Sequence, residues 1–319
     1  MLIILFIGFI TLIYYVGSIN VNSLYILNTS ITKYSIIARE IHYNDLETVI
    51  QRQTLNKSII LFCTDSGYIN LFLNAYYASQ LKEYKNLVVT CFDRHCYRTL
   101  SDLNIPVAIL DIANNNSINT QTASTWGTKA FQNKVQWKLV MLMRALDLNI
   151  KVLYVDSDII LLKNPFAYLN SIQGYDLIAQ KDTTICSGFM YLHPTSKTKA
   201  LIKKAAILRP KLKNAGDQKA ILTAVREFPT IKTFLLPIEL FSSGENFFNT
   251  HSYYWDPINS TQIMIHNNYV IGTNNKLFRY KELKMYKLDV NGEYSNPNGK
   301  YLTIENWSKV YALILNYRK

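Results

Sequence analysis

VLYVDSDIILLKNPF, at residues 152–166, is the most informative part of the sequence. Its first four residues belong to the segment KVLYV at 151–155, and a continuous apolar run of this length is typical of a strand buried in a parallel sheet. The run stops at Asp156-Ser157-Asp158, which places two carboxylates at the carboxyl end of a strand. Open α/β sheets bind ligands at that edge. The stretch therefore predicts an α/β fold with a ligand site at Asp156 and Asp158.

Further apolar runs extend this sheet on both sides. We expect strands at 58–63, 86–92, 105–110, 151–155, 176–180, 188–192, 232–236 and 262–266. Apolar residues at helical spacing predict helices at 129–148, 196–208 and 217–227, and one helix after each of the first two strands. A strand, helix, strand, helix order predicts a mostly parallel, Rossmann-like central sheet flanked by helices. A polar loop at 114–125 is of the kind that overhangs a site.

The composition describes a folded, basic protein. The 319 residues are 49% hydrophobic and 18% charged, which is ample for a buried core. The net charge of +12 suits an anionic ligand, but the 34 Lys and Arg residues are not gathered in one run. No base-reading module accompanies them, so we expect no nucleic-acid partner.

The N-terminus predicts a membrane location. Residues 2–19 carry no charge and are about as long as the ~18 apolar residues that a membrane-spanning helix needs. We expect a transmembrane signal anchor at 1–19, a stem at 20–57 and a catalytic domain at 58–319, with a cleavable signal peptide as the alternative. The anchor predicts a single-pass type II protein of the Golgi or another secretory-pathway membrane. Its catalytic domain would then lie in the lumen. Sequons at Asn28, Asn56, Asn115, Asn259 and Asn306 fit that location without establishing it.

The four cysteines do not have the spacing of a structural zinc site. In an oxidising compartment, a disulfide from Cys91 to Cys96 or from Cys63 to Cys91 is compatible with the sequence, and spacing alone does not choose between them. The fourth cysteine is Cys186.

A series of ordered motifs resembles one family. The chain resembles the nucleotide-diphospho-sugar transferases of glycosyltransferase family 77, which have the GT-A fold, over about 58–286. The motifs are WGTKAF at 126–131, VLYVDSDIILLKNPF at 152–166, SGFMY at 187–191, GDQ at 216–218, LPIELF at 236–241 and IHNNYVIG at 265–272. The family has Asn before its Ser-Gly-Phe, and Cys186 stands there in this chain. A side-chain contact at that position is therefore in doubt.

The resemblance implies a divalent cation, Mn²⁺ or Mg²⁺, on a UDP-sugar. Two carboxylates one residue apart can place oxygens on one hard cation, and Asp156 and Asp158 would do so, although an isolated pair equally suits a strand cap. His266 would add an imidazole, while a lone histidine is more often a core residue. Asp156, Asp158 and His266 are the expected metal ligands.

Other residues are expected around the donor. Asp217 and Gln218 would face the transferred sugar, although Asp217 also suits a helix cap. The expected donor-binding residues are Asp156, Ser157, Ser187, Gly188, Gly272, Lys276 and Lys138. Lys276 would contact the diphosphate, and Arg279 suits either such a contact or a solvated surface position. Lys134 and Lys138 lie one helical turn apart, where like charges repel. Either a phosphate or a uracil carbonyl of the donor lies between them, or the two lysines form a solvent-facing stripe.

The resulting hypothesis is a metal-dependent glycosyltransferase. It would move a pentose-type or galactose-type sugar from a UDP-sugar to an acceptor hydroxyl of a glycan or glycoprotein, with retention of configuration. A non-catalytic sugar-binding or scaffold protein of the same fold is the alternative. A magnesium-dependent phosphohydrolase fits poorly, because Ile160 occupies the place where that class wants Thr or Val.

Overall fold

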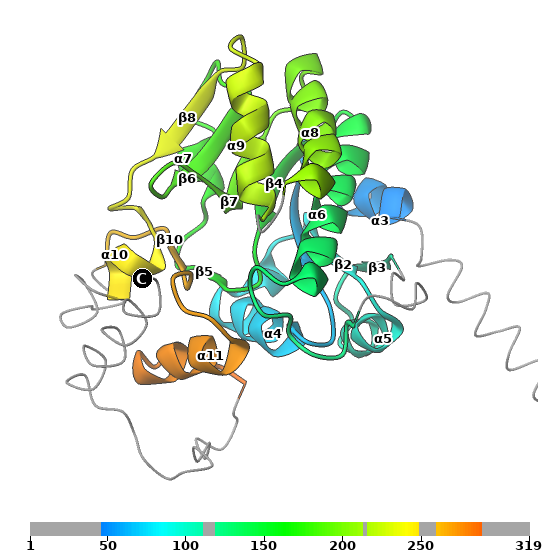
Figure 1. The fold of residues 1–319 in the computed structure, drawn as a ribbon. Helices are drawn as coiled ribbons and strands as arrows, with labels where there is room; N and C mark the ends of the chain where they lie inside the picture. Colours follow the sequence, from blue (N-terminus) through cyan, green and yellow to red (C-terminus); the bar gives the residue numbers. More distant parts are fainter. Residues whose placement is uncertain (1–45, 111–118, 213–215, 249–259, 289–319) are drawn as a thin grey trace, which may run out of the picture.

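A computed structural model describes residues 46–110, 119–212, 216–248 and 260–288 (Figure 1). Within these ranges helices and strands follow one another in the order α3 (Leu46–Gln53), β1 (Ser58–Thr64), α4 (Ile69–Ala78), η1 (Leu81–Glu83), β2 (Leu87–Cys91), α5 (Arg94–Asp102), β3 (Val107–Ile109), α6 (Lys129–Asp147), β4 (Lys151–Val155), β5 (Ile159–Leu161), α7 (Phe166–Leu169), β6 (Leu177–Lys181), β7 (Ile185–Leu192), α8 (Ser196–Leu208), η2 (Arg209–Lys211), α9 (Asp217–Glu227), β8 (Thr233–Leu236), β9 (Phe241–Ser242), α10 (Gly244–Asn246), β10 (Met264–His266) and α11 (Thr273–Glu282).

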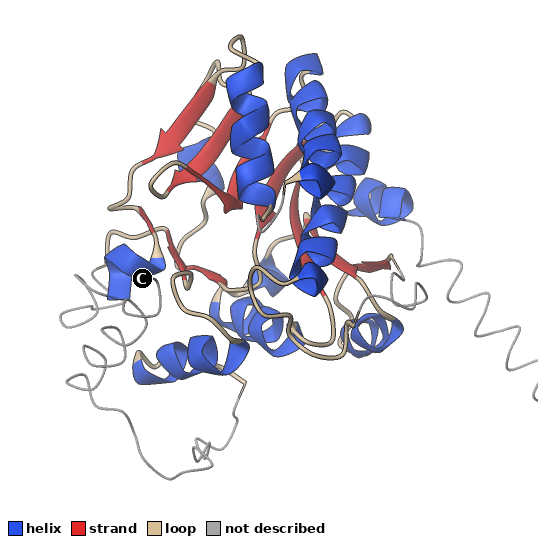
Figure 2. Ribbon diagram, in the orientation of Figure 1, coloured by secondary structure: helices blue, strands red, loops and turns tan. Residues whose placement is uncertain are grey.

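The described strands form a larger sheet of seven strands in the order β3-β2-β1-β4-β7-β6-β8. Every neighbouring pair is parallel except the two that involve β7, which runs antiparallel to both β4 and β6. Helices lie on both sides of this sheet (Figure 2). The predicted α/β fold with a mostly parallel central sheet is therefore confirmed.

Two hydrophobic cores cover the two faces of the larger sheet. Successive side chains of a strand point to opposite faces, so in β4 Val152 and Tyr154 join the core under α6, α8 and α9. Leu153 and Val155 join the core under α4, α5 and α7. Figure 1 shows α6, α8 and α9 side by side on their face. The continuous apolar run of β4 is required because both of its faces are covered.

Helix α3 lies within the segment expected to be a stem. Its Leu46, Val49 and Ile50 are buried in the core under α6. Glu47 makes two hydrogen bonds with Arg144 of α6, at 2.6 and 2.7 Å. The packed domain therefore includes α3 and extends N-terminal to the expected boundary at 58. The polar composition of α3 gave no sign that it packs on the domain, because only one side of this short helix is buried.

A smaller sheet brings distant parts of the chain to the end of β4. Among the described residues it has the order β5-β10-β9. β10 pairs antiparallel with β5, with His266 opposite Ile159, and parallel with β9. β5 begins directly after Asp158, so this register places His266 beside that aspartate. Strands β5 and β9 were not anticipated, because strands of two or three residues carry no readable period. Helix α11 was not anticipated either, because its buried residues are only Arg279 and Tyr280, which form no apolar stripe.

The N-terminal anchor expected at 1–19 and most of the stem fall outside the described residues, as do 114–118 of the polar loop. The same holds for the sequons at Asn28, Asn115, Asn259 and Asn306. Among the described residues, no helix is both long and apolar enough to cross a bilayer. Asn56 is exposed in the turn before β1.

One of the two disulfides considered above is formed. Cys91 at the end of β2 is bonded to Cys96 in the first turn of α5, with the two Cα atoms 5.8 Å apart. Cys63 and Cys186 are free thiols. Asp93 caps α5 and also accepts two hydrogen bonds from Ser66, at 2.5 and 2.8 Å. The disulfide and its capping aspartate thus hold the loop that follows β1.

Candidate active site

Asp156, Asp158 and His266 meet where β4 ends. One potential ligand atom from each lies within 4.8 Å of the other two. Asp158 and His266 are buried, whereas the Asp156 side chain is 33% exposed. Two carboxylates and an imidazole form a donor set that suits Mn²⁺ or Mg²⁺, with imidazole favouring the transition metal. The three residues therefore fit the cation that the sequence analysis expected.

Asp156 is held by its own strand and by helix α6. The Tyr154 hydroxyl donates to Asp156 Oδ1 at 2.8 Å, and Lys138 Nζ lies 3.3 Å from the same oxygen. The Asp156 amide donates to the Gly188 carbonyl of β7 at 2.8 Å. Oδ1 is therefore the anchored oxygen of this carboxylate.

Asp158 is held from three sides. Lys276 of α11 forms an ion pair with Oδ2, and His266 Nε2 lies 3.4 Å from Oδ1. The Asp158 carbonyl accepts from the Tyr280 hydroxyl at 2.6 Å and from the Asn267 amide at 2.9 Å. Burial raises the pKa of Asp158, but Lys276 and His266 outweigh burial and hold it well below its usual range. This carboxylate is ionised at any physiological pH.

His266 is enclosed and faces Asp158. Burial lowers the pKa of His266, but the Asp158 carboxylate outweighs burial and raises it to about 10. The imidazole is thus protonated at neutral pH in the free protein. Binding of a cation at Nε2 requires the loss of that proton, so binding there is coupled to proton release.

Two buried lysines of α6 are paired with carboxylates. Lys138 Nζ lies 2.7 Å from Asp217 Oδ2, besides its contact with Asp156. Lys134 Nζ lies 2.6 Å from Asp65 Oδ2, at the end of β1. Both lysines are 5% exposed, so the solvent-facing stripe is wrong. Each has its own carboxylate partner, and no anion between the two is needed to explain their spacing.

The remaining predicted residues lie around Asp156, Asp158 and His266, and they differ in which groups they contact. The Ser187 carbonyl accepts from Lys138 at 2.8 Å, and the Ser187 amide donates to Gln218 at 3.4 Å. Ser157 donates to the Cys63 carbonyl at 3.4 Å, which leaves its side chain turned toward β1. Gly272 has a φ of +91° and caps α11, the helix that carries Lys276. Gly272 thus sets the start of the helix that carries Lys276.

Arg279 belongs to the packing of α11. It is 1% exposed, and its guanidinium donates to the Asn268 carbonyl at 3.0 Å and lies 4.5 Å from the centre of the Phe248 ring. These contacts hold the loop after His266 in place.

Several residues of the site were missed from the sequence. Tyr154 carried a usable signal, since a strand residue two positions before Asp156 points to the same face. Asp65 follows β1 as Asp156 follows β4, which also marks it. Burial raises the pKa of Asp65 to about 6 even though Lys134 opposes this. Gln180 and Tyr280 carried no signal, because only the tertiary fold brings them to His266 and Asp158.

Gly188 predicts the first test of the site. A Cβ at this position would lie 2.5 Å from His266 Cε1 and 2.8 Å from Asp156 Oδ2. Both contacts are too short, so Gly188→Ala is expected to push two of the three candidate ligands apart and weaken Mn²⁺ binding by about tenfold or more. Isothermal titration calorimetry of the nucleotide-free protein measures this.

Gly216→Ala is the matched control for Gly188→Ala. Its Cβ would meet Phe131 at an ordinary 3.8 Å, so Mn²⁺ affinity is expected to stay unchanged. Equal affinities in Gly188→Ala and Gly216→Ala would contradict the proposed ligand set.

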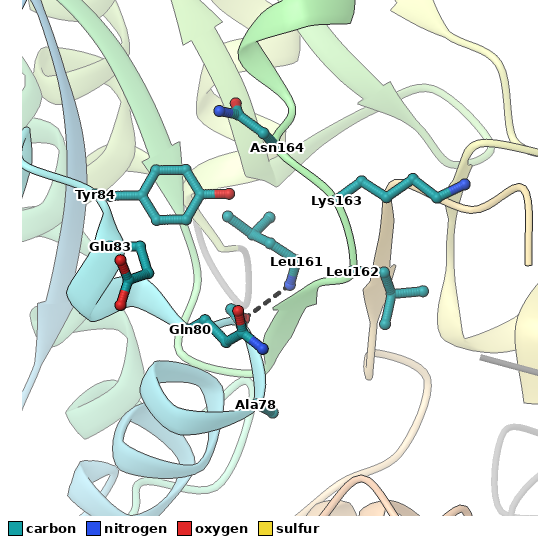
Figure 3. A pocket seen from close by; sticks show the side chains of 9 residues that line it. Ala78, Gln80, Glu83, Tyr84, Leu161, Leu162, Lys163 and Asn164 are labelled. Atoms are coloured by element: carbon teal, nitrogen blue, oxygen red, sulfur yellow. Dashed lines mark hydrogen bonds between the residues drawn. The ribbon is translucent and has the colours of Figure 1, made fainter. Parts of the chain in front are cut away.

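A separate hollow lies on the far side of β5. It has a volume of about 320 Å³ and lies between the α4–η1 segment and the chain that leaves β5 (Figure 3). Its walls are joined by the Leu161 amide, which donates to Ser79 Oγ at 2.8 Å. Glu83, Tyr84, Lys163 and Asn164 are among its lining residues. None of the predicted site residues lines it, so we do not assign the donor there.

Comparison with known families agrees with this geometry. The family model described as nucleotide-diphospho-sugar transferase matches residues 82–280. The chain belongs to this family. The match includes Asp156, Asp158, His266 and Lys276, so the nucleotide-diphospho-sugar transferase region contains the whole cluster.

Curated relatives of this nucleotide-diphospho-sugar transferase are glycosyltransferases. The UDP-D-xylose:L-fucose alpha-1,3-D-xylosyltransferase 3 of Arabidopsis thaliana is 28% identical over 214 residues, which are 58% of this chain and 55% of the relative. The UDP-galactose:fucoside alpha-3-galactosyltransferase of Dictyostelium discoideum is 25% identical over 283 residues, 78% of this chain and 42% of the relative. The chain thus spans about half the length of the curated relatives it matches.

Solved structures with some likeness are also glycosyltransferases. The apo form of GlyE from Streptococcus pneumoniae TIGR4 has a TM-score of 0.46 and 16% identity, covering 82% of this chain and 63% of that one. The galactosyltransferase LgtC, in complex with donor and acceptor sugar analogs, has a TM-score of 0.46 and 12% identity, covering 79% and 95%.

Proposed function

We propose that this nucleotide-diphospho-sugar transferase moves a pentose-type or galactose-type sugar from a UDP-sugar to an acceptor hydroxyl, with Mn²⁺ or Mg²⁺. The observation that carries the proposal is the meeting of Asp156, Asp158 and His266 within 4.8 Å at the carboxyl end of β4. Family membership supports sugar transfer, and the printed activities of the two relatives suggest xylose or galactose as the sugar.

The residues of the site divide the work of stabilising a departing diphosphate. When bound, the cation would neutralise negative charge on the two phosphates. Lys276 stands beside Asp158 on the N-terminal half of α11 and would supply a second positive charge to the leaving group. Lys138 stays buried against Asp156 and Asp217, and so fixes the positions of both carboxylates. The Lys138 side chain is 6% exposed, whereas that of Lys276 is 19% exposed, so we assign Lys138 as a positioning residue.

Retention of configuration is part of the proposal. Asp217 is 5% exposed and paired with Lys138, so its carboxylate is poorly placed to attack a sugar. Gln218 is neutral and follows it in the first turn of α9. These residues favour attack by the acceptor hydroxyl from the side of the leaving diphosphate, which would take up the hydroxyl proton. Gln218 would orient the sugar, next to Asp217, which Lys138 holds in place.

We also propose a secretory location with the catalytic domain in the lumen. Support comes from the apolar segment at 2–19 and from the Cys91–Cys96 disulfide, since disulfides persist mainly in oxidising compartments. The partners would be the donor, a glycan or glycoprotein acceptor and the membrane. The non-catalytic sugar-binding or scaffold protein is the alternative.

A panel of donors tests the proposal. We expect the purified protein, with Mn²⁺, to release UDP from UDP-xylose or UDP-galactose, and faster when L-fucose or a simple fucoside is added. Product anomers are read by NMR. Metal-independent turnover would contradict the role of the cation, an inverted product would contradict retention, and a folded protein inactive with every UDP-sugar would favour the scaffold alternative.

A further inference from the structure

Gln180 is a buried amide that touches the candidate metal ligand His266. It belongs to β6 and is fully buried. Its Oε1 lies 2.8 Å from His266 Nδ1, the ring nitrogen that faces away from Asp158. The other ring nitrogen, Nε2, faces the carboxylates. Gln180 is therefore placed to decide which nitrogen of His266 is available to a cation.

The orientation of the Gln180 amide is set by a backbone carbonyl. Its Nε2 donates to the Phe241 carbonyl oxygen at 3.4 Å. A carbonyl can only accept, so the NH₂ group must face Phe241 and Oε1 must face His266. Oε1 in turn can only accept, which requires that His266 Nδ1 carries a hydrogen.

The pairing of β6 with its neighbour β7 is irregular at Gln180. The pairing of β6 with β7 shifts register between Ala179 and Gln180, and after the shift Gln180 lies opposite Cys186. Such bulges re-aim a side chain and are frequent beside active sites. Cys186 Sγ also lies 3.5 Å from His266 Nδ1, on the same side of the ring.

We propose that Gln180 is a positioning residue for the metal site: it accepts the Nδ1 hydrogen of His266 and thereby directs the lone pair of Nε2 toward Asp156 and Asp158. Cys186 packs against the same nitrogen as a weaker partner, since a thiol is a poor acceptor. The inference rests on the metal dependence in the proposed function. Outer partners of metal-bound histidines typically change metal affinity by about 10- to 100-fold when they are removed.

The test is Mn²⁺ affinity of the nucleotide-free protein, measured by calorimetry and by the electron paramagnetic resonance signal of free Mn²⁺. Gln180→Met keeps the length of the side chain and removes the acceptor, so affinity is expected to fall about 10- to 100-fold. Gln180→Glu keeps an acceptor for the Nδ1 hydrogen but loses the donor to the Phe241 carbonyl, so it is expected to bind Mn²⁺ more tightly than Gln180→Met does. Gln136→Met is the control, because Gln136 lies on α6 and donates to the Ala206 carbonyl away from the site.

Unchanged Mn²⁺ affinity in folded Gln180→Met would overturn the inference while leaving the metal site itself in place. If the unmodified protein and Asp156→Asn bind Mn²⁺ equally, the metal part of the proposed function fails, and the inference fails with it.

A second measurement needs no variant. In the Zn²⁺-loaded protein, long-range ¹H–¹⁵N spectra should show His266 with a protonated Nδ1 and a coordinated Nε2. Coordination through Nδ1 would overturn the inference even if Gln180→Met does not fold.

Discussion

We expect Asp156→Asn to lower UDP-sugar turnover by about 100- to 1000-fold, the loss typical when one electrostatic stabiliser is removed from an active site. Asn keeps the shape of the side chain and can still accept from Tyr154, but it cannot neutralise a cation. Stability should change little. The side chain is one-third exposed, and Lys138 keeps Asp217 as a closer partner, at 2.7 Å compared with 3.3 Å.

The measurement is UDP release at saturating Mn²⁺, together with thermal unfolding to show that the variant is folded. Asp147→Asn, on the exposed end of α6, is the matched control and should keep full activity. A fully active Asp156→Asn variant would remove the basis for the proposed function.

Lys138→Met is expected to have the largest effect on stability. Lys138 is 5% exposed and lies beside two carboxylates, of which Asp217 is equally buried. Removing one partner of a buried ion pair leaves an uncompensated charge, which costs about 3–5 kcal/mol. The free energy of unfolding in urea measures this loss, and Lys129→Met at the exposed start of the same helix serves as the control.

A double variant shows where that loss originates. Asp217→Asn added to Lys138→Met should recover part of the stability, because the uncompensated carboxylate is then gone. Burial lowers the pKa of Lys138, but Asp156 and Asp217 outweigh burial and raise it above its usual range. The stabilisation is therefore complete at neutral pH and is lost only as the pH rises through the raised pKa. Equal unfolding free energies for Lys138→Met and Lys129→Met would contradict the role given to Lys138.

The larger sheet could be predicted well because its strands are fully buried. In β1, β2 and β4 both faces are covered, so the sequence shows uninterrupted apolar runs with clear ends. The start of β7 was missed by three residues. The strand was expected from Gly188, but it begins at Ile185, because pairing with β6 includes Ile185 and Cys186.

The acidic pair was readable because it directly follows a strand, and the late histidine because it ends another. What could not be read is which charges neutralise one another. Lys134 and Lys138 looked like one pair of repelling charges along α6, whereas the fold gives each a separate carboxylate from β1, β4 or α9. Sequence spacing reports neighbours along one helix. It does not report the loop ends that the sheet brings against that helix.

The candidate metal site is complete only after the smaller sheet has formed. Lys276 and Asp158 are 118 positions apart in the sequence, and β10 must add to β5 before His266 can reach the aspartates. A chain stopped before Met264 would contain every strand of the larger sheet, which ends with β8 at Leu236, yet it would lack the imidazole and the α11 lysine. Pairing between strands far apart in the sequence is slow, because the entropy of loop closure is lost before the contacts form. The stoichiometry of metal binding would therefore report the fraction of fully folded molecules in a preparation. Secondary-structure content does not distinguish these molecules from ones that lack the smaller sheet.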